Sequence, residues 1–304
     1  MKLDYRVFDG ETKLIPLIGY PLKKGAGVSS AFSEIFRVNG INAISLPMEV
    51  EKGHIGDFLE ACKVFHVDKF SLTMPHKADV IPFLDEVDTP SRLFHSVNQV
   101  TTVDGKLVGK GFDGIGTIRS LEAVGAKLKG ANVMMIGAGS ISGVIGYELA
   151  QSGVEHLTIL NRTVANAQNV GQTLADNTNM KVSWGGLTEK ELDDAAAKAN
   201  VLVQVSAQGM AGMPQHPYLG FLAKLTKDCV VMEGVIAPVE TEFVIEARKQ
   251  GFDPALGLDM AANQAAAVVE FLFPGTTLTR NDAKLVVDII CDSTGLPVPK
   301  HWQT

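Results

Sequence analysis

The sequence is poor in cysteine. Its 304 residues include only Cys62, Cys229 and Cys291, which lie far apart and form no Cys-x-x-Cys pair. A disulfide framework usually needs an even set of cysteines, and a structural zinc site needs closely spaced Cys and His ligands. We therefore expect neither a disulfide scaffold nor a metal site.

Basic charge and long apolar runs are also scarce. The chain has 27 Lys and Arg against 34 Asp and Glu, a net charge of −7, and no basic cluster. Proteins that neutralise nucleic-acid phosphates usually have the opposite balance, so we expect no nucleic-acid partner. Residues 1–6 lack the apolar core of a signal peptide, and no apolar run reaches the roughly 18 residues of a membrane span. These absences predict a soluble, cytoplasmic protein without a membrane partner.

Apolar residues make up 46% of the chain, enough for a buried core, and the length favours two domains. Strand-like and helix-like segments alternate, which is typical of α/β proteins with largely parallel sheets. We predict strands at residues 14–19, 43–47, 69–74, 132–136, 156–160, 201–205 and 229–232. We predict helices at residues 28–38, 54–64, 116–124, 263–273 and 282–292, and one that ends at residue 150. Residues 104–111 are expected to form turns.

A glycine-rich loop follows the apolar run at residues 132–136. It reads Gly137-Ala138-Gly139-Ser140-Ile141-Ser142-Gly143 and precedes a helical segment. Such glycines allow a tight turn and bring the phosphates of a dinucleotide close to backbone N–H groups at a helix N-terminus. Because Ser142 takes the third position of the G-x-G-x-x-G fingerprint, the glycines alone are weak evidence, but their place between a strand and a helix favours dinucleotide binding. We predict that the cofactor binds at residues 137–141.

The end of the next strand indicates which dinucleotide binds. An NAD site usually has Asp or Glu there to accept from the ribose 2′-hydroxyl, whereas an NADP site lacks that carboxylate and has a cation for the 2′-phosphate. This chain has Asn161-Arg162-Thr163. Arg162 is suited to stack on adenine and to pair with the phosphate, and Thr163 adds a hydroxyl donor. The sequence therefore predicts NADP(H), with all three residues in its site.

A candidate for proton transfer follows another predicted strand. Oxidation of an alcohol needs a group that takes the hydroxyl proton while hydride goes to a nicotinamide. Lys77 closes the segment Leu72–Lys77, just past the end of a strand, where open α/β sheets bind ligands. Asp113 is suited to orient such a lysine, and Asn98 supplies an amide between them in the sequence. Taken alone, a lysine after a strand is usually a solvated surface charge.

Together these segments resemble the shikimate dehydrogenase family. The family's Asn-Val-Thr-x-Pro-x-Lys motif corresponds to Ser71–Lys77, its Ala-Val-Asn-Thr motif to Ser96–Gln99, and its Asn-Thr-Asp-Gly motif to Gly111–Gly114. Its Gly-Ala-Gly-Gly loop corresponds to residues 137–140, its Asn-Arg-Thr to residues 161–163, and its late Gln-Ala to residues 264–265. These motifs occur in the family's order.

The resemblance implies an NADP-dependent alcohol dehydrogenase that interconverts a ring hydroxyl and a ketone, as in aromatic amino acid biosynthesis. It implies an N-terminal α/β substrate domain (residues 1–112 and 258–304), a Rossmann-type doubly wound NADP domain (residues 113–257) and a cleft between them. It also implies a catalytic Lys77/Asp113 pair and a possible homodimer. The remaining implied contacts are those of Thr73, Asn98 and Gln264 with substrate and of Ser206 with cofactor.

The sequence departs from the family where the carboxylate of shikimate is held. The family has serines where this chain has Gly25 and Gly27, and a tyrosine where it has Ile236. Each lost hydrogen bond to a charged group weakens binding by about 1.5–3 kcal/mol. We infer that shikimate is not the best substrate and that a larger or differently substituted cyclic alcohol suits a pocket opened by glycine. Lys23 and Lys24 are either a replacement charge contact or ordinary solvated lysines.

Two other functions remain open. One is an NADP-sensing or regulatory protein that binds the cofactor without turnover, and the other is an NAD-dependent quinate dehydrogenase. The presence of Lys77 together with Asp113 argues against the first, because a sensor has little use for a catalytic pair. Asn161-Arg162 argues against the second.

Overall fold

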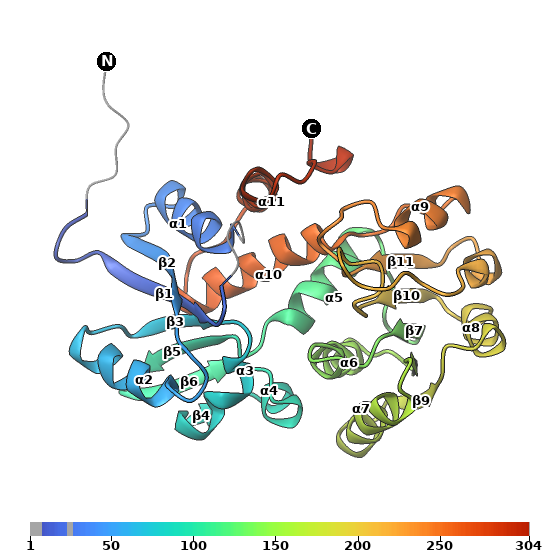
Figure 1. Cartoon of the computed structure of the whole chain (residues 1–304), viewed down its shortest axis with the longest axis horizontal. Coiled ribbons are helices and arrows are strands. Elements are labelled where there is room, and N and C mark those ends of the chain that lie inside the picture. Colours follow the sequence, from blue (N-terminus) through green and yellow to red (C-terminus); the bar gives the residue numbers. More distant parts are fainter. Residues whose placement is uncertain (1–7, 23–26, 304) are drawn as a thin grey trace. The chain divides into compact units, whose positions relative to one another are not determined.

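The computed structural model describes residues 8–22 and 27–303, and the chain divides into two compact units (Figure 1). The first unit comprises Met1–Phe112 and Ala265–Thr304, and the second comprises Asp113–Gln264. The chain returns to the first unit inside helix α10 (Gly257–Leu272). The boundary predicted between residues 257 and 258 falls at the start of this helix.

The first unit is built on a mixed sheet with the strand order β2-β1-β3-β5-β6-β4. β1 is parallel to β2 and β3, whereas β5 is antiparallel to both β3 and β6. This mixed sheet differs from the mainly parallel one that the pattern predicts. The turn expected at Asp104-Gly105 is present, but residues 106–110, also expected to lie among turns, form β6, which pairs with β5 in an antiparallel hairpin. Its tip is Asp104-Gly105, with φ of 49° and 79°, and Asp-Gly is a strong signal for a two-residue hairpin turn.

The strands of this unit are β1 (Lys13–Gly19), β2 (Ala43–Glu49), β3 (Lys69–Leu72), β4 (Glu86–Val87), β5 (Gln99–Val103) and β6 (Lys106–Lys110). Its helices are α1 (Val28–Val38), α2 (Ile55–Val64), α3 (His76–Asp79), α4 (Thr89–Phe94) and α11 (Arg280–Thr294), with 3-10 turns η1 (Ile81–Phe83) and η3 (Lys300–Trp302). Helix α2 covers one face of the sheet, and α1 and α11 cover the other (Figure 1).

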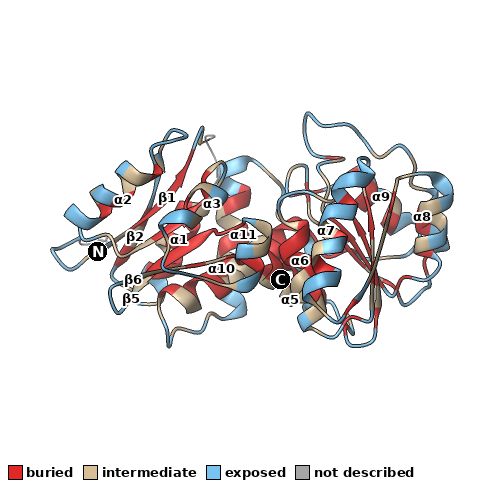
Figure 2. Cartoon of the chain, turned by 90° about the horizontal axis from the view of Figure 1, so that it is seen from below, coloured by how far each residue is buried: buried red, intermediate tan, exposed pale blue. Residues whose placement is uncertain are grey.

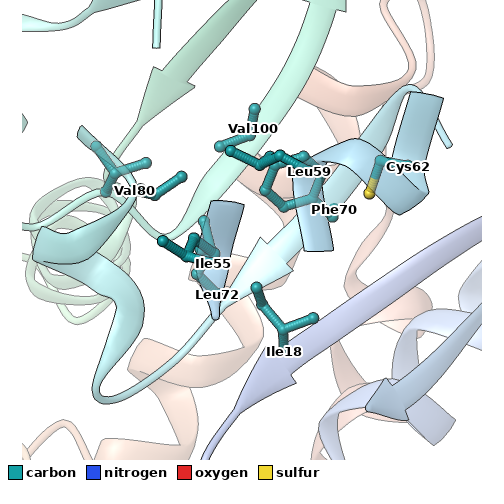
Figure 3. Packing of buried hydrophobic residues seen from close by; sticks show 9 residues of the cluster. Ile18, Ile55, Leu59, Cys62, Phe70, Leu72, Val80 and Val100 are labelled. Carbon is teal, nitrogen blue, oxygen red and sulfur yellow. The ribbon is translucent and has the colours of Figure 1, made fainter. Parts of the chain in front are cut away.

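The core beneath α2 is apolar throughout. Figure 3 shows Ile55, Leu59 and Cys62 of this helix packed against side chains of the sheet, among them Phe70 and Leu72. Phe70 is fully buried and Leu72 nearly so. This packing holds β3 in place, and the segment that contains Lys77 follows directly after this strand.

Helix α11 fills the space beside Gly27. Gly27 precedes α1 with φ 67°, a left-handed conformation that favours glycine. A Cβ added there would lie 2.2 Å from Ser293 Oγ and 3.1 Å from Ile290 Cα, both on α11. The expectation of a pocket opened by glycine is therefore wrong at this position, because the missing side chain makes room for a helix. Gly25, Lys23 and Lys24 lie outside the described residues.

The second unit is a doubly wound parallel sheet with the strand order β11-β10-β7-β8-β9. From the central β7, the chain adds β8 and β9 on one side and then β10 and β11 on the other. Helices α6 and α7 cover one face, and α8 and α9 cover the opposite face (Figure 1). This is the Rossmann-type topology predicted from the sequence, and it is confirmed.

The strands of this unit are β7 (Asn132–Ile136), β8 (His156–Leu160), β9 (Lys181–Gly185), β10 (Val201–Gln204) and β11 (Val230–Glu233). Its helices are α5 (Asp113–Ala123), α6 (Ser142–Gln151), α7 (Val164–Asn177), α8 (Glu189–Ala196) and α9 (Glu242–Lys249), with the 3-10 turn η2 (Gly220–Lys224). Figure 2 shows the central strands buried and the outer helix faces exposed. Because both sheet faces are covered, β7 reads as a continuous apolar run rather than an alternating one.

All three cysteines are buried and free. Burial raises the pKa of Cys62 to about 11 and that of Cys229 to about 12, so both thiols stay protonated and act as small apolar core residues. Within residues 8–22 and 27–303, no group of three or more His, Cys, Asp or Glu suits a metal ion. In this same part of the chain, no helix is long and apolar enough to cross a membrane.

We expect Gly27→Ala to lower the free energy of unfolding by about 1–3 kcal/mol, because its Cβ overlaps α11. Gly40→Ala is the matched control, since Gly40 also has a positive φ (68°) but its added Cβ meets no described atom within 4 Å. Urea unfolding followed by circular dichroism measures both. Equal shifts for the two variants would show that backbone strain alone, and not contact with α11, explains the glycine.

Candidate active site

The glycine-rich loop joins β7 to α6 at the carboxyl end of the parallel sheet. Gly137 has φ 119°, and a Cβ there would lie 2.7 Å from the backbone N of Ser206. Only glycine therefore lets this loop approach the chain that follows β10. An added Cβ at Gly139, by contrast, would meet no described atom within 4 Å, so this side of the loop is open to an approaching ligand.

Side chains hold the loop in place. Ala138 N donates to Asn161 Oδ1 over 3.3 Å, and Asn161 Nδ2 donates to the carbonyl of Thr163 over 2.9 Å. Gly139 N donates to the buried Ser142 Oγ over 3.0 Å. Ser142, the departure from the glycine fingerprint, thus fastens the loop to the first residue of α6.

These contacts leave two residues of the loop for the predicted diphosphate. The amides of Ala138 and Gly139 are engaged by side chains, and Ser140 and Ile141 follow immediately before α6. The N-terminus of a helix of this length favours negative charge, because its first N–H groups and its dipole point toward the ligand. The loop therefore suits a diphosphate at residues 140 and 141.

The end of β8 presents no carboxylate. Asn161 takes the position at which an NAD site has an acid, and its amide is committed to the glycine-rich loop. Arg162 and Thr163 follow, both exposed, before α7 begins at Val164. The position is thus open to a 2′-phosphate, and the contacts of Arg162 and Thr163 with it stay predictions.

A buried network, which the sequence analysis missed, lies at the ends of β10 and β11. Gln204 and Glu233 are the last residues of these strands and are register partners. Gln204 Oε1 accepts from Ser206 N over 2.6 Å, and Gln204 Nε2 donates to Glu233 Oε1 over 3.0 Å. Glu233 is fully buried, and this burial raises the pKa of its carboxyl to about 7. The predicted cofactor residue Ser206 is thus positioned through an amide and a buried acid.

The lysine segment is built differently from its prediction. β3 ends at Leu72 rather than at Met74, and Lys77 belongs to the short helix α3. The fully buried His76 anchors this helix, because its Nε2 lies 2.6 Å from the carbonyl oxygen of Val50. The backbone carbonyl of Lys77 accepts from Val97 N over 3.1 Å.

Two other predicted substrate residues lie on the same segments of the first unit. Thr73 N donates to the carbonyl of Ile18 over 2.9 Å, at the carboxyl end of β1. The carbonyl of Asn98 accepts from Leu72 N over 2.8 Å, and Asn98 Oδ1 accepts from Phe112 N over 3.1 Å. Backbone hydrogen bonds therefore bring the segments of Thr73, Lys77 and Asn98 together at the carboxyl ends of β1 and β3.

The second unit brings together Asp113 and Gln264. Asp113 is the buried first residue of α5, and its Oδ1 accepts from Gln264 Nε2 of α10 over 2.9 Å. Gly116 permits this approach, because its Cβ would lie only 2.8 Å from Gln264 Cβ and 2.9 Å from the carbonyl of Met260. The observed partner of Gln264 is thus the predicted catalytic carboxylate, and its contact with substrate stays a prediction.

The predicted catalytic pair belongs to two units. Lys77 lies in the first, and Asp113 lies in the second. The pairing of these two side chains stays a prediction, as does the assignment of substrate and cofactor to separate domains.

A doubly wound sheet with a glycine-rich loop before a helix places the chain among two-unit α/β proteins of the dinucleotide-binding class. Residues 17–100 match the family model described as "Shikimate dehydrogenase substrate binding domain". Residues 120–209 match the model described as "Shikimate / quinate 5-dehydrogenase". The chain belongs to the shikimate dehydrogenase family.

Known proteins are similar to this chain over most of its length. The shikimate dehydrogenase (NADP(+)) of Alkaliphilus oremlandii is 32% identical, over 87% of this chain and 92% of that protein. The shikimate 5-dehydrogenase of Listeria monocytogenes, solved with shikimate and NAD, has a TM-score of 0.85 at 24% identity and covers 93% of this chain and 99% of its own. The 5-ketofructose reductase of Gluconobacter sp. strain CHM43 has a TM-score of 0.81 at 24% identity, with 92% and 100% covered. The predicted family and fold class are confirmed.

Glu233 makes stability depend on pH. Its pKa is raised from 4.5 to about 7 in the folded state, so the folded protein binds more protons than the unfolded chain between these values. Its contribution to the free energy of unfolding therefore falls as pH rises from 4.5 to about 7. We expect Glu233→Gln to change stability little at pH 5 but to raise it by about 2–3 kcal/mol at pH 8, relative to the wild type.

Urea unfolding at the two pH values measures this effect. Glu191→Gln is the control, because hydrogen bonds from Thr188 and Gly186 lower the pKa of Glu191. Removal of this carboxylate should therefore not raise the free energy of unfolding at pH 8. A difference between Glu233→Gln and wild type that is the same at both pH values would contradict the prediction.

Proposed function

We propose that the protein is an NADP(H)-dependent oxidoreductase of the shikimate dehydrogenase type, which interconverts a ring hydroxyl and a ketone on shikimate or a related cyclic hydroxy compound. The supporting observation is that both family models match the chain. One matched region contains the candidate residue for proton transfer, and the other contains the candidate residues for cofactor binding. Residues 17–100 contain Lys77, and residues 120–209 contain the glycine-rich loop and Arg162. A relative that aligns with 87% of the chain is named as an NADP(+) enzyme.

The residues of the second unit suit NADP. The amides of Ser140 and Ile141 and the dipole of α6 receive the diphosphate, and Arg162 pairs with the 2′-phosphate. Asn161 avoids the repulsion that a carboxylate would exert on that phosphate, while it holds the loop through Ala138. NADP(H) held by these residues would supply the hydride acceptor for the carbinol carbon and the hydride donor for the ketone.

Lys77 moves the accompanying proton. As a neutral amine, its Nζ accepts the hydroxyl proton while the C–H bond is broken, and as an ammonium it returns that proton to the ketone oxygen. We assign Asp113 to the orientation of this lysine and to proton sharing with it. Gln264 holds Asp113 in one orientation, because it donates to Oδ1.

The substrate departs from shikimate at its carboxylate end. Of the family's anchoring hydroxyls, the one at position 27 is replaced by glycine against α11, and the tyrosine is replaced by the partly exposed aliphatic side chain of Ile236. Neither position donates a side-chain hydrogen bond to an anion. The fold alone does not determine which substrate binds, because a 5-ketofructose reductase has the same fold. We therefore propose a related cyclic hydroxy compound, with shikimate as a poorer substrate.

We also propose that the enzyme works in the cytoplasm on small molecules alone. The acidic net charge of −7 supports this, since nucleic acids and anionic membranes attract the opposite sign. The homodimer implied by the family resemblance stays a prediction.

We expect Arg162→Ala to weaken NADPH binding by about 10- to 100-fold and NADH binding by less than about threefold, because only NADPH has the 2′-phosphate. Titration of cofactor fluorescence gives both dissociation constants. Lys227→Ala is the matched control, since it removes an exposed positive charge ahead of β11, at the amino end of the sheet. Equal losses for the two cofactors would count against Arg162 as the residue that selects NADP.

We expect Lys77→Ala to lower kcat by about 10²- to 10⁴-fold and to leave the dissociation constant of NADPH unchanged. Lys77→Arg should be as slow, because arginine keeps the charge but does not release a proton at neutral pH. The substrate is the fastest member of a panel of shikimate, quinate and uncharged cyclic polyols. A variant with nearly the full rate would refute the role of Lys77, and a wild type that binds NADPH but turns over no compound would favour the sensor function.

A further inference from the structure

Glu233 is a buried acid to which the proposed reaction assigns no role. It is the last residue of β11, beside the last residue of β10, and its side chain is fully buried. Ionised carboxylates are seldom buried without a cationic partner. This carboxyl therefore needs an explanation beyond packing.

Three neutral donors form hydrogen bonds with the carboxyl group of Glu233. Gln204 Nε2 and Val235 N both donate to Oε1, over 3.0 and 2.9 Å, and Thr241 Oγ1 donates to Oε2 over 2.7 Å. Thr241 is also the N-cap of α9, where its hydroxyl accepts from Val244 N. These donors orient the carboxylate but carry no net charge, so they leave its negative charge uncompensated.

The strand order indicates where the carboxylate of Glu233 lies relative to the proposed cofactor. A dinucleotide spans the carboxyl end of a doubly wound sheet with its diphosphate at the first glycine-rich turn and its adenosine at the next strand. Here the diphosphate loop follows β7 and the adenosine end follows β8, so the nicotinamide end lies toward β10 and β11. Ser206, which Gln204 holds, packs directly against Gly137 of the diphosphate loop. Glu233 is thus at the nicotinamide end of the proposed cofactor site.

We propose that the buried carboxylate of Glu233 favours binding of NADP⁺ over NADPH, because the oxidised nicotinamide ring is positively charged and the reduced ring is neutral. The attraction is stronger here than at a surface, since burial lowers the local dielectric and the donors around the acid are neutral. This inference rests on the proposed function, because it assumes that NADP(H) occupies the second unit. Glu233 thereby shifts the bound cofactor toward the form that oxidises an alcohol.

Glu233→Gln tests the charge while keeping the geometry. The amide oxygen still accepts from Gln204 and Val235, and the amide nitrogen faces Thr241 Oγ1, which is able to accept. At pH 8.5 the wild-type carboxyl is ionised, since its pKa is about 7. Isothermal titration with NADP⁺ and with NADPH should show about three- to tenfold weaker NADP⁺ binding in the variant and unchanged NADPH binding.

Glu191→Gln is the matched control on the other half of the sheet. Glu191 accepts from Gly186 N and Thr188 at the end of β9, and glutamine satisfies the same capping box. It should leave the ratio of the two dissociation constants unchanged.

The outcomes separate this inference from the proposed function. An unchanged ratio in Glu233→Gln, or an equal loss of both affinities, would overturn the inference alone, because the wild type would still bind NADP(H). A wild type that binds neither form would overturn both. A selective loss of NADP⁺ binding in Glu233→Gln, but not in Glu191→Gln, supports it.

Discussion

The site in the second unit depends on one close approach, that of the Gly137 backbone to the backbone of Ser206. A side chain at Gly137 would overlap that chain, so the loop after β7 and the segment after β10 reach this spacing only with glycine. The contact joins the turn that suits a diphosphate to the strand ends on the opposite side of the sheet. The proposed sites for the two ends of a dinucleotide thereby lie next to each other on this sheet.

Hydrogen bonds with polar side chains maintain this close approach. Asn161 and Ser142 hold the glycine-rich loop, and Gln204 holds the segment of Ser206. Glu233 in turn holds Gln204. Gln204 and Glu233 are fully buried, and an unpaired polar group would be costly there. Removal of either side chain would leave the other buried without this hydrogen bond.

Helix packing explains two glycines of this chain, Gly27 and Gly116. Gly27 suggests a wider pocket when only the sequence is considered, but α11 occupies the space of its side chain. Asp113 and Gln264, which are far apart in the sequence, share a hydrogen bond because Gly116 lets α5 and α10 meet. Both cases show that the role of a glycine depends on which helix lies against it.

The sequence by itself determined the doubly wound unit, the glycine-rich loop between β7 and α6 and the absence of an acid after β8, because these are local patterns of apolar runs, glycines and charge over short segments. It did not reveal the β5–β6 hairpin in the mixed sheet or the helix against Gly27. It also did not reveal that Glu233 and Gln204 meet at neighbouring strand ends. Tertiary structure alone decided these features, since each depends on segments distant in the chain, whose pairing is set by the register of the sheet and the packing of helices upon it.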